Sequence, residues 1–194
     1  MQTEDYEYLY KLEEEFWWFA GMREITASVL DDFCVGGKGF KVLDAGCGTG
    51  LNLEWLRRYA IEENIFGLDF SSDAIDFCRT RNLKNLVQAS ATDLPFADES
   101  LDLILMCGVL EYTPLDTGLR EAARVLKKGA PLVLLPVKPS LVGSMLELLY
   151  KFKIHPIDNV RVAASRYFNI VGNHEFPITE PIAWSKTIFL LEKK

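Results

Sequence analysis

The sequence predicts an α/β protein with a doubly wound, mostly parallel sheet and helices on both faces. Two observations predict this class. Short apolar runs alternate with segments of helical periodicity through the middle of the chain. The apolar runs are nearly continuous, which is typical of parallel strands that are buried on both faces. This pattern implies parallel pairing with helices on both faces, and right-handed crossovers then give a doubly wound sheet. The length of 194 residues indicates one domain with a small appendage.

The N-terminal segment is predicted to be helical and separate from the sheet. Two helices are expected, over 5–20 and 22–33, with the break between them near Gly21. The run Gly36-Gly37-Lys38-Gly39 then breaks the helical pattern. We therefore predict a helical cap over 1–35 and the main domain over 36–194.

Strands and helices alternate after this boundary. Helix starts and ends are read from capping residues, such as Ser71 or Ser72 at one start and Lys127-Lys128-Gly129 at one end. The first five strands are expected at 40–45, 65–69, 86–89, 101–107 and 131–137. The helices are expected at 50–60, from 71 or 72 to about 82, and at 116–127. Beyond Lys138 the pattern predicts a helix over 140–152, a sixth strand within 163–176 and a seventh over 184–192.

Charge is unevenly distributed along the chain. The net charge is −7, and the first 35 residues hold nine acidic but only two basic side chains. An acidic protein of this kind has little affinity for phosphate backbones, so we expect no nucleic-acid partner. The acidic N-terminal segment is interpreted as a solvated helix face.

The cysteines and histidines do not indicate a metal site. Cys34, Cys47, Cys78 and Cys107 lack metal-ligand spacing, and the two histidines lie far apart in the sequence. Reduced thiols and the absence of a signal-peptide pattern favour a cytoplasmic location. The most apolar run, 101–110, is too short to span a membrane.

The residues that follow the predicted strands carry the candidate chemistry, since doubly wound sheets bind ligands at the carboxyl ends of their strands. The first strand leads into Asp44-Ala45-Gly46-Cys47-Gly48-Thr49-Gly50, in which three glycines allow a tight turn and a close approach to a ligand. The second strand ends in Asp69, which could accept both hydroxyl protons of a ribose. After the third strand, Asp93 and Leu94 could contact an adenine ring.

The loop differs from the two common phosphate-binding motifs. The dinucleotide fingerprint needs a third glycine where this chain has Leu51, and no P-loop motif occurs. The loop reads D-x-G-x-G-x-G, and its leading acid suits an amino-bearing ligand better than a pyrophosphate.

Residues 42–50 resemble the first motif of class I S-adenosylmethionine-dependent methyltransferases. Asp69, residues 93–96, 103–112 and 119–136 resemble the later motifs in the same order. The resemblance covers about 40–137, and it is strongest to the "type 11" small-molecule group. It implies S-adenosylmethionine as cofactor, S-adenosylhomocysteine as product, and a Rossmann-like sheet of order 3-2-1-4-5-7-6 with strand 7 antiparallel.

The resemblance also implies roles for single residues. Asp44, Ala45, Gly46, Gly48 and Gly50 would hold the methionine part of the cofactor. Asp69 would bind the ribose, Phe70 would lie beside the adenine, and Asp93 and Leu94 would bind the adenine edge. Cys107 and Gly108 would line the site near the sulfonium.

The segment from Phe16 to Arg23 resembles a cap of some bacterial members. Here we hypothesise that Arg23 reaches the cofactor carboxylate and that Trp17 or Trp18 covers the sulfonium. A helix that packs its aromatic face on the core is an equal alternative.

The acceptor side is less defined by the sequence. Candidate groups are Glu111, Tyr112, Tyr167 and His174, although packing or surface roles are the more ordinary interpretation of each. The family often has histidine where this chain has Tyr112, which removes a histidine-based role there. Residues 138–183 are predicted as a lid or acceptor-specificity segment.

The apolar stretch 141–152 within that segment allows several interpretations. It could be a lid over an apolar acceptor, a weak membrane-surface contact, or a helix buried against the sheet or a partner chain. A homodimer is therefore one alternative.

We expect the protein to methylate a small molecule by in-line displacement, a reaction that needs alignment more than a catalytic triad. A non-catalytic cofactor-binding regulator and, less favoured, a nicotinamide-dependent oxidoreductase are the alternatives. The acceptor and the methylated atom are not encoded in any motif.

Overall fold

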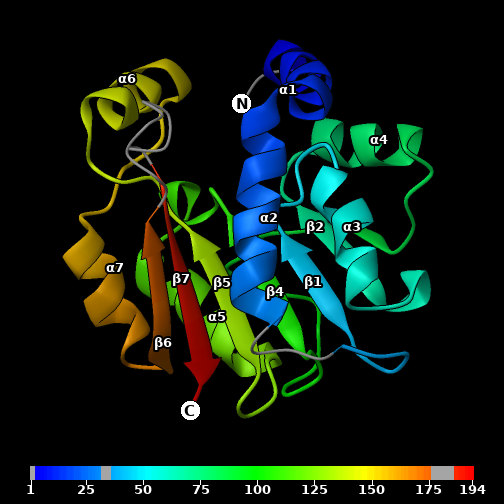
Figure 1. Cartoon of the computed structure of the whole chain (residues 1–194), viewed down its shortest axis with the longest axis vertical. Helices are drawn as coiled ribbons and strands as arrows, with labels where there is room; N and C mark the ends of the chain where they lie inside the picture. Colours follow the sequence, from blue (N-terminus) through cyan, green and yellow to red (C-terminus); the bar gives the residue numbers. More distant parts are fainter. Residues whose placement is uncertain (1–2, 32–35, 176–185) are drawn as a thin grey trace.

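The computed structural model describes residues 3–31, 36–175 and 186–194, and its centre is a seven-stranded sheet (Figure 1). The strand order is β3-β2-β1-β4-β5-β7-β6, which confirms the order that the resemblance implies. Neighbouring strands are parallel from β3 to β5, and β7 is antiparallel to both of its neighbours. The strands are Val42–Ala45 (β1), Ile65–Asp69 (β2), Leu86–Gln88 (β3), Leu103–Cys107 (β4), Pro131–Leu135 (β5), Phe168–Glu175 (β6) and Thr187–Lys193 (β7).

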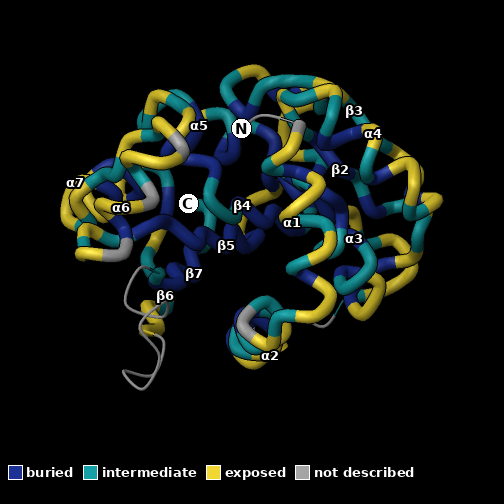
Figure 2. The backbone as a smooth tube through the Cα atoms, turned by 90° about the horizontal axis from the view of Figure 1, so that it is seen from above, coloured by how far each residue is buried: buried dark blue, intermediate teal, exposed yellow. Residues whose placement is uncertain are grey.

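Helices lie on both faces of this sheet. Seen from above, the buried strands form a central layer between them (Figure 2). The α-helices are Thr3–Glu15 (α1), Trp17–Asp31 (α2), Leu51–Trp55 (α3), Ser72–Thr80 (α4), Leu115–Val125 (α5), Leu141–Tyr150 (α6) and Ile157–Ala164 (α7). Short 3-10 turns occur at Leu56–Arg58 (η1), Glu62–Asn64 (η2) and Leu110–Tyr112 (η3).

The two faces of the sheet belong to two separate apolar clusters because successive strand residues point to opposite sides. In β1, Val42 packs with side chains of α2, α3 and α4, whereas Leu43 packs with side chains of α5 and α7. The same alternation continues through β4 and β5. Every residue of β5 is buried, as expected for a central strand covered on both faces.

The N-terminal helices differ from the prediction in their boundary. The chain leaves α1 at Glu15 and enters α2 at Trp17, so the break falls at Phe16 and Gly21 lies inside α2. The half-buried Phe16 packs against the apolar cluster beneath α2 and contacts the ring of Phe19. Anchoring of this ring sets the bend, and the prediction of a break near Gly21 is wrong.

The C-terminal third contains one helix that the periodicity does not predict. Helix α7 is only eight residues long, starts after Pro156, and packs Val160, Ala163 and Ala164 into the core. The sixth strand follows this helix at Phe168–Glu175, inside the predicted range of 163–176, and Ala163 and Ala164 in that range belong to the helix. The predicted start of the seventh strand, at 184 and 185, falls outside the described residues, and β7 begins at Thr187.

Helix α6 forms where expected, but it is not buried against the sheet. Four of its large apolar side chains are exposed, at Leu141, Met145, Leu148 and Leu149. Among the described side chains of α6, the large apolar ones therefore do not pack on the sheet, which argues against the interpretation of 141–152 as a helix buried there. Among the described helices, none is long and apolar enough to cross a bilayer.

Candidate cofactor site

The glycine loop turns sharply from β1 into α3. The amides of Gly46 and Cys47 both donate to the carbonyl of Leu68, at 2.6 and 2.9 Å, which ties the loop to β2. Gly48 has φ +53°, and a Cβ there would meet nothing within 4 Å. This glycine therefore leaves open space beside the backbone, where a ligand could approach closely.

Gly50 has a different task in the same loop. Its φ is +92°, and a Cβ would lie 2.5 Å from Leu83 Cδ1 and 2.9 Å from Cys78 Sγ. The residue ends the loop and forms the N-cap of α3. Gly50 and the fully buried Ala45 line neither of the cavities described below. Their contribution is therefore to the conformation of the loop and not to contact with a ligand.

Asp69 lies at the carboxyl end of β2 and faces the loop. Its Oδ2 accepts from the Gly48 amide at 2.9 Å, and its Oδ1 accepts from the Ser71 amide at 2.9 Å. Burial raises the pKa of this carboxyl, and the backbone donors offset part of the rise. The carboxylate is thus held in one orientation with acceptor capacity remaining.

Asp44 lies at the carboxyl half of β1, next to Asp69 and directly before the loop. The side chain is fully buried, and neither carboxylate oxygen has a hydrogen-bond partner among the described residues. Burial, followed by the negative charge of Asp69, raises its pKa to about 8, and the neighbouring Asn52 side chain opposes part of this rise. A buried carboxylate without hydrogen bonds or a counter-charge destabilises the fold. A cation or hydrogen-bond donor of a ligand would compensate it at this position.

Two cavities meet at the loop. The larger, of about 760 Å³, lies within the range of roughly 300–1,000 Å³ typical of ligand sites. The smaller, of about 180 Å³, lies between the loop and α2. They share Leu9, Gly46, Gly48 and Cys107.

The larger cavity contains several of the predicted cofactor residues. Asp69, Phe70 and Gly108 line it, and so does Thr92 after β3. Phe70 is 80% exposed, so its ring has one face available to a ligand. Tyr6 and Leu9 of α1 close the cavity on the N-terminal side.

The structure does not bring Asp93 and Leu94 into that cavity. Leu94 is buried in the core, and its amide donates to Glu121 Oε2 at 3.0 Å. Asp93 is exposed, and neither residue lines the cavity that Thr92 reaches. Their role at an adenine edge stays a prediction.

Arg23 lines the smaller cavity from α2, opposite the glycine loop. Glu13 of α1, Asn52 and Trp55 line the same space. Burial lowers the pKa of Arg23, and the negative charge of Glu13 opposes this effect. Trp17 is exposed and lines neither cavity, and the Trp18 side chain lies outside the described residues.

The acceptor-side candidates separate into two groups. Glu111 is buried beyond β4, its Oε1 accepts from the Val137 amide at 2.5 Å, and its Oε2 has no partner among the described residues. Tyr112 lines the larger cavity. Tyr167 instead bonds Asp116 Oδ2 at 3.2 Å, and His174 is exposed on the edge strand β6, so neither joins the site.

Sequence reasoning missed one basic residue beside Cys107 and Gly108. The Lys186 Nζ lies 3.6 Å from the position that a Cβ on Gly108 would take. Burial raises the pKa of the Cys107 thiol, and the charge of Lys186 partly lowers it. Lys186 follows a segment without a motif, so only the pairing of β7 with β5 brings it here.

The sequence also gives no signal for the contacts that hold α1 on the site. The Arg81 guanidinium donates to Glu13 at 3.1 Å, to Glu14 at 2.6 Å and to the carbonyl of Thr49 at 2.9 Å. It also lies 4.2 Å from the centroid of the Tyr10 ring. We call these contacts the Arg81 clamp, and they connect α1 to the glycine loop and to the end of α4.

Comparison with known proteins places this arrangement in context. Residues 43–134 match a family model described as "Methyltransferase domain". A fatty-acid O-methyltransferase of Mycolicibacterium smegmatis is 39% identical over 106 residues, covering 53% of this chain and 39% of that protein. An uncharacterized protein of Methanocaldococcus jannaschii is 32% identical over 160 residues, covering 78% of this chain and 68% of that protein. The chain spans less than half the length of the first curated relatives that it matches.

A solved structure shows the same fold. Geranyl diphosphate C-methyltransferase from Streptomyces coelicolor A3(2), crystallised with Mg2+, geranyl diphosphate and S-adenosyl-L-homocysteine, aligns with a TM-score of 0.72. The sequence identity is 17%, and the alignment covers 88% of this chain and 77% of that one. Among the described residues, no cluster of side chains could hold a metal ion.

Proposed function

Because residues 43–134 match a methyltransferase-domain model, we propose that this chain moves a methyl group from S-adenosylmethionine to a small-molecule acceptor. The observation that carries this proposal is the buried carboxyl of Asp44, which lacks a partner at the start of the glycine loop. The α-amino group of the cofactor is a cation of the kind that would compensate this carboxylate. A nicotinamide dinucleotide would place a negatively charged pyrophosphate near such a loop, and this group could not compensate the carboxylate of Asp44.

We assign the nucleoside half of the cofactor to the larger cavity. Asp69 is fixed by the Gly48 and Ser71 amides, and its remaining acceptor positions suit two ribose hydroxyls. Phe70 would stack against the adenine, and Thr92 would lie near its edge. Asp93 and Leu94 take part only if the turn after β3 moves toward the cavity.

We assign the amino-acid half to the smaller cavity. Arg23 would pair with the cofactor carboxylate there. Asp44 is fully buried and lines neither cavity, so it would compensate the ammonium from beneath the loop. Because the two cavities share Gly46, Gly48 and Cys107, the link between the two halves would pass the carboxyl end of β4. Cys107 and Gly108 would then lie beside the sulfur.

When bound, the cofactor supplies a methyl group on a positively charged sulfur. The contribution of the chain is to align the acceptor opposite that sulfur and to exclude water, and orientation is worth up to roughly 7–11 kcal/mol. Tyr112 lines the open part of the cavity, and Glu111 carries a free buried oxygen nearby. Glu111 would receive a proton only when the acceptor is protonated.

We further propose that the acceptor is a small apolar molecule. Apolar side chains such as Leu9, Val109 and Pro114 line the larger cavity around its polar groups. The net charge of −7 does not favour a nucleic acid. The fatty acid named for the Mycolicibacterium smegmatis relative is an acceptor of the expected kind.

Titration calorimetry with S-adenosylhomocysteine tests the cofactor site. We expect micromolar binding to the unmodified protein, and no binding of NAD. Asp69→Ala removes two charge-assisted hydrogen bonds to the ribose, and the affinity should fall roughly 100-fold or more. Arg23→Ala removes one carboxylate contact and should weaken binding about tenfold.

Asp76→Ala is the matched control, because Asp76 lies exposed on α4, lines neither cavity and forms an ion pair with the exposed Arg79. Its affinity should equal that of the unmodified protein. Binding of NAD in place of S-adenosylhomocysteine would refute the proposal. Tight cofactor binding without turnover of any apolar acceptor would favour the non-catalytic regulator.

A further inference from the structure

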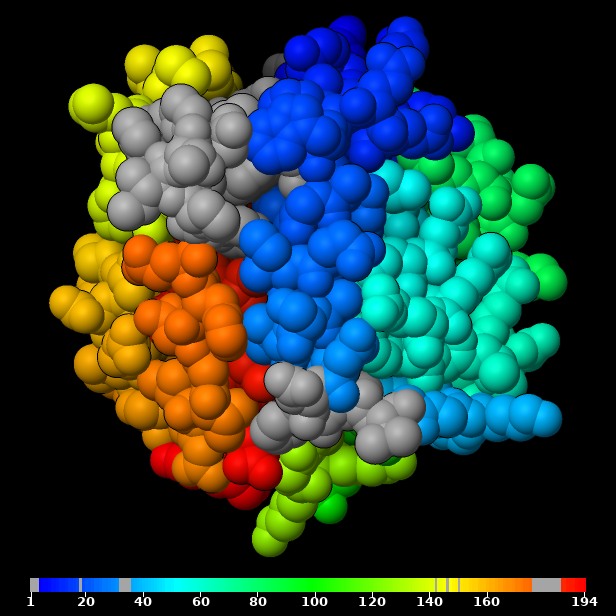
Figure 3. All heavy atoms as spheres, in the orientation of Figure 1, coloured from blue at the N-terminus to red at the C-terminus, as the bar shows by residue number. Residues whose placement is uncertain are grey.

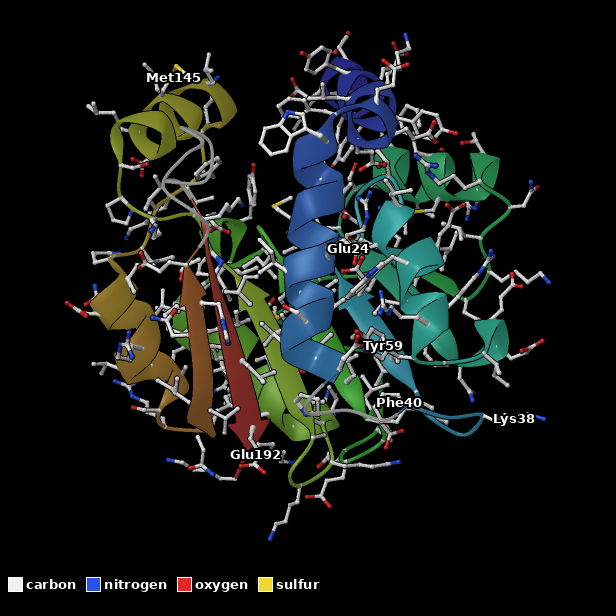
Figure 4. All side chains as sticks on the ribbon, viewed as in Figure 1. Glu24, Lys38, Phe40, Tyr59, Met145 and Glu192 are labelled. Carbon is white, nitrogen blue, oxygen red and sulfur yellow. The ribbon has the colours of Figure 1, made fainter. Side chains whose placement is uncertain are left out.

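Helix α6 presents four large apolar side chains to solvent. Leu141, Met145, Leu148 and Leu149 are 94%, 55%, 81% and 64% exposed. Their spacing of i, i+4, i+7 and i+8 places them on one face of the helix. Figure 4 shows Met145 on the outer side of α6, away from the sheet.

The opposite side of α6 is the one that contacts the protein. A Cβ on Gly143 would lie 2.4 Å from the Lys138 carbonyl oxygen, so only glycine allows this approach. The Glu147 carboxylate accepts from the Ile154 amide at 2.9 Å. A surface helix normally buries its apolar stripe, whereas among the described side chains of α6 the large apolar ones are exposed, Gly143 is buried and Glu147 is half-buried. A contiguous exposed apolar face of this kind marks an interaction surface.

Charge around this face indicates the type of partner. Lys151 and Lys153 follow the helix and are both exposed, and Glu147, the single acid between 141 and 153, is held against the Ile154 amide. Lysines at the border of an apolar face can extend to lipid phosphates while their stems stay in the apolar layer. We propose that the face formed by Leu141, Met145, Leu148 and Leu149 docks on the surface of a phospholipid bilayer.

The segment that follows α6 contacts the wall of the larger cavity. The Phe152 ring packs on Tyr112 with centroids 5.6 Å apart, and Tyr112 lines that cavity. The Lys153 amide donates to the carbonyl of Glu111 at 3.0 Å. Phe152 and Lys153 therefore connect the docking helix to the residues that border this cavity. Aromatic rings at such a boundary suit the interface between lipid and water.

Helix α1 also lies at this end of the molecule and carries several acids (Figure 1). We therefore expect apolar insertion to supply most of the binding, with the lysines contacting the phosphates that all phospholipids carry. The inference goes beyond the proposed function, because lipid contact and cofactor binding can be measured separately.

The test is co-sedimentation of the full chain with vesicles of phosphatidylcholine, and of phosphatidylcholine with one third phosphatidylglycerol. We expect binding to both, because the apolar face does not need lipid charge. Leu141→Glu/Leu148→Glu should lower the vesicle affinity by about tenfold or more. Lys151→Gln/Lys153→Gln should lower it by a smaller factor, and mainly for the vesicles with phosphatidylglycerol.

Val162→Glu is the matched control, since Val162 is an exposed apolar residue of α7 and receives the same charge. This variant should bind vesicles as the unmodified protein does. All variants should keep unchanged binding of S-adenosylhomocysteine, which shows that they are folded.

If the unmodified protein binds the cofactor product but neither vesicle, docking is refuted while the proposed function stands. If the unmodified protein binds vesicles but not S-adenosylhomocysteine, the docking proposal stands and the proposed function is refuted. The protein could instead be a dimer that Leu148→Glu dissociates and that does not bind vesicles. This result would refute docking on a bilayer and would show that a second copy of the chain covers the face.

Discussion

Asp69 and Asp44 lie at the ends of neighbouring strands, and their different burial and hydrogen bonding give two identical side chains different properties. Asp69 accepts two backbone hydrogen bonds and faces a cavity, so it is prepared to act as an acceptor. Asp44 is fully buried without a partner, and its pKa rises to about 8. Burial without compensation destabilises the ionised form, so Asp44 stores an unfavourable contribution that a cationic ligand would relieve.

The raised pKa of Asp44 predicts how the free energy of unfolding of the unmodified protein and of Asp44→Asn should differ with pH. The pKa of Asp44 is higher in the folded state than in the unfolded state, so the folded protein binds the extra proton between about pH 4 and pH 8. The free energy of unfolding of the unmodified protein should therefore fall across this window relative to the variant. The slope is at most about 1.4 kcal/mol per pH unit.

Urea unfolding at pH 5 and pH 8 measures this effect. The variant should be the more stable of the two proteins at pH 8, by roughly 2 kcal/mol or more. Binding of S-adenosylhomocysteine to the unmodified protein should release a proton near pH 7, which buffers of different ionisation enthalpy would reveal. Equal pH profiles for both proteins would mean that Asp44 is already ionised or solvated.

At the scale of elements, the position of α1 depends on the Arg81 clamp. The Arg81 and Glu13 side chains are only 5% and 10% exposed, so this ion pair is largely shielded from water. Burial raises the pKa of Glu13, and its hydrogen bonds with Thr49 and Arg81 oppose the rise. Since Thr49 belongs to the glycine loop, α1 and the loop are held by the same few groups.

Arg81→Met should release α1 because it leaves Glu13 buried without its counter-charge. Loss of one partner of a buried pair costs about 3–5 kcal/mol, which undocking of the helix can avoid. Hydrogen exchange should therefore accelerate in α1 but not in β4 or β5. The affinity for S-adenosylhomocysteine should fall, because Tyr6, Leu9 and Glu13 line the two cavities.

Arg79→Met is the control for this variant. Arg79 pairs with Asp76, and both side chains are about two thirds exposed, so its removal should cost less than about 1 kcal/mol. If both variants leave exchange in α1 unchanged, the clamp does not hold the helix.

At the scale of the whole molecule, the two N-terminal helices are not equivalent. Helix α2 runs along the front of the sheet, and its side chains fill the surface between α3 and β6 (Figure 3). Met22, Val29 and Leu30 are buried in the same cluster as β1, β4, β5 and β7. Helix α2 is thus one layer of the α/β/α sandwich, whereas α1 covers the carboxyl edge of the strands. A boundary at residue 35 stays a prediction.

Two truncations distinguish these roles. Removal of residues 1–16 should leave a protein that unfolds cooperatively at a lower temperature and binds S-adenosylhomocysteine weakly. Removal of residues 1–35 also exposes the cluster beneath α2, and each large apolar side chain lost from it costs about 1.5–3 kcal/mol. Three such side chains approach the whole stability of an ordinary domain. We expect no cooperative transition in calorimetry, and a normal transition for this truncation would show that α2 is a dispensable cap.

The sequence by itself determined the features that depend on local pattern. The apolar runs placed β1, β2, β4 and β5 within a few residues, since a buried parallel strand is apolar throughout. The loop after β1 and the acid ending β2 could be assigned to one site because parallel strands bring their carboxyl ends to one edge. The strand order itself came only with the family resemblance.

The tertiary structure decided what depends on contacts between distant segments. The bend at Phe16, the burial of Asp44 and the meeting of Arg81 with Glu13 arise from packing across the chain. The position of Lys186 beside Gly108 follows from the antiparallel insertion of β7, and no local pattern records it. The outward face of α6 has the same origin: periodicity shows that a helix has an apolar stripe, but only the folded chain decides whether that stripe meets the core or the solvent.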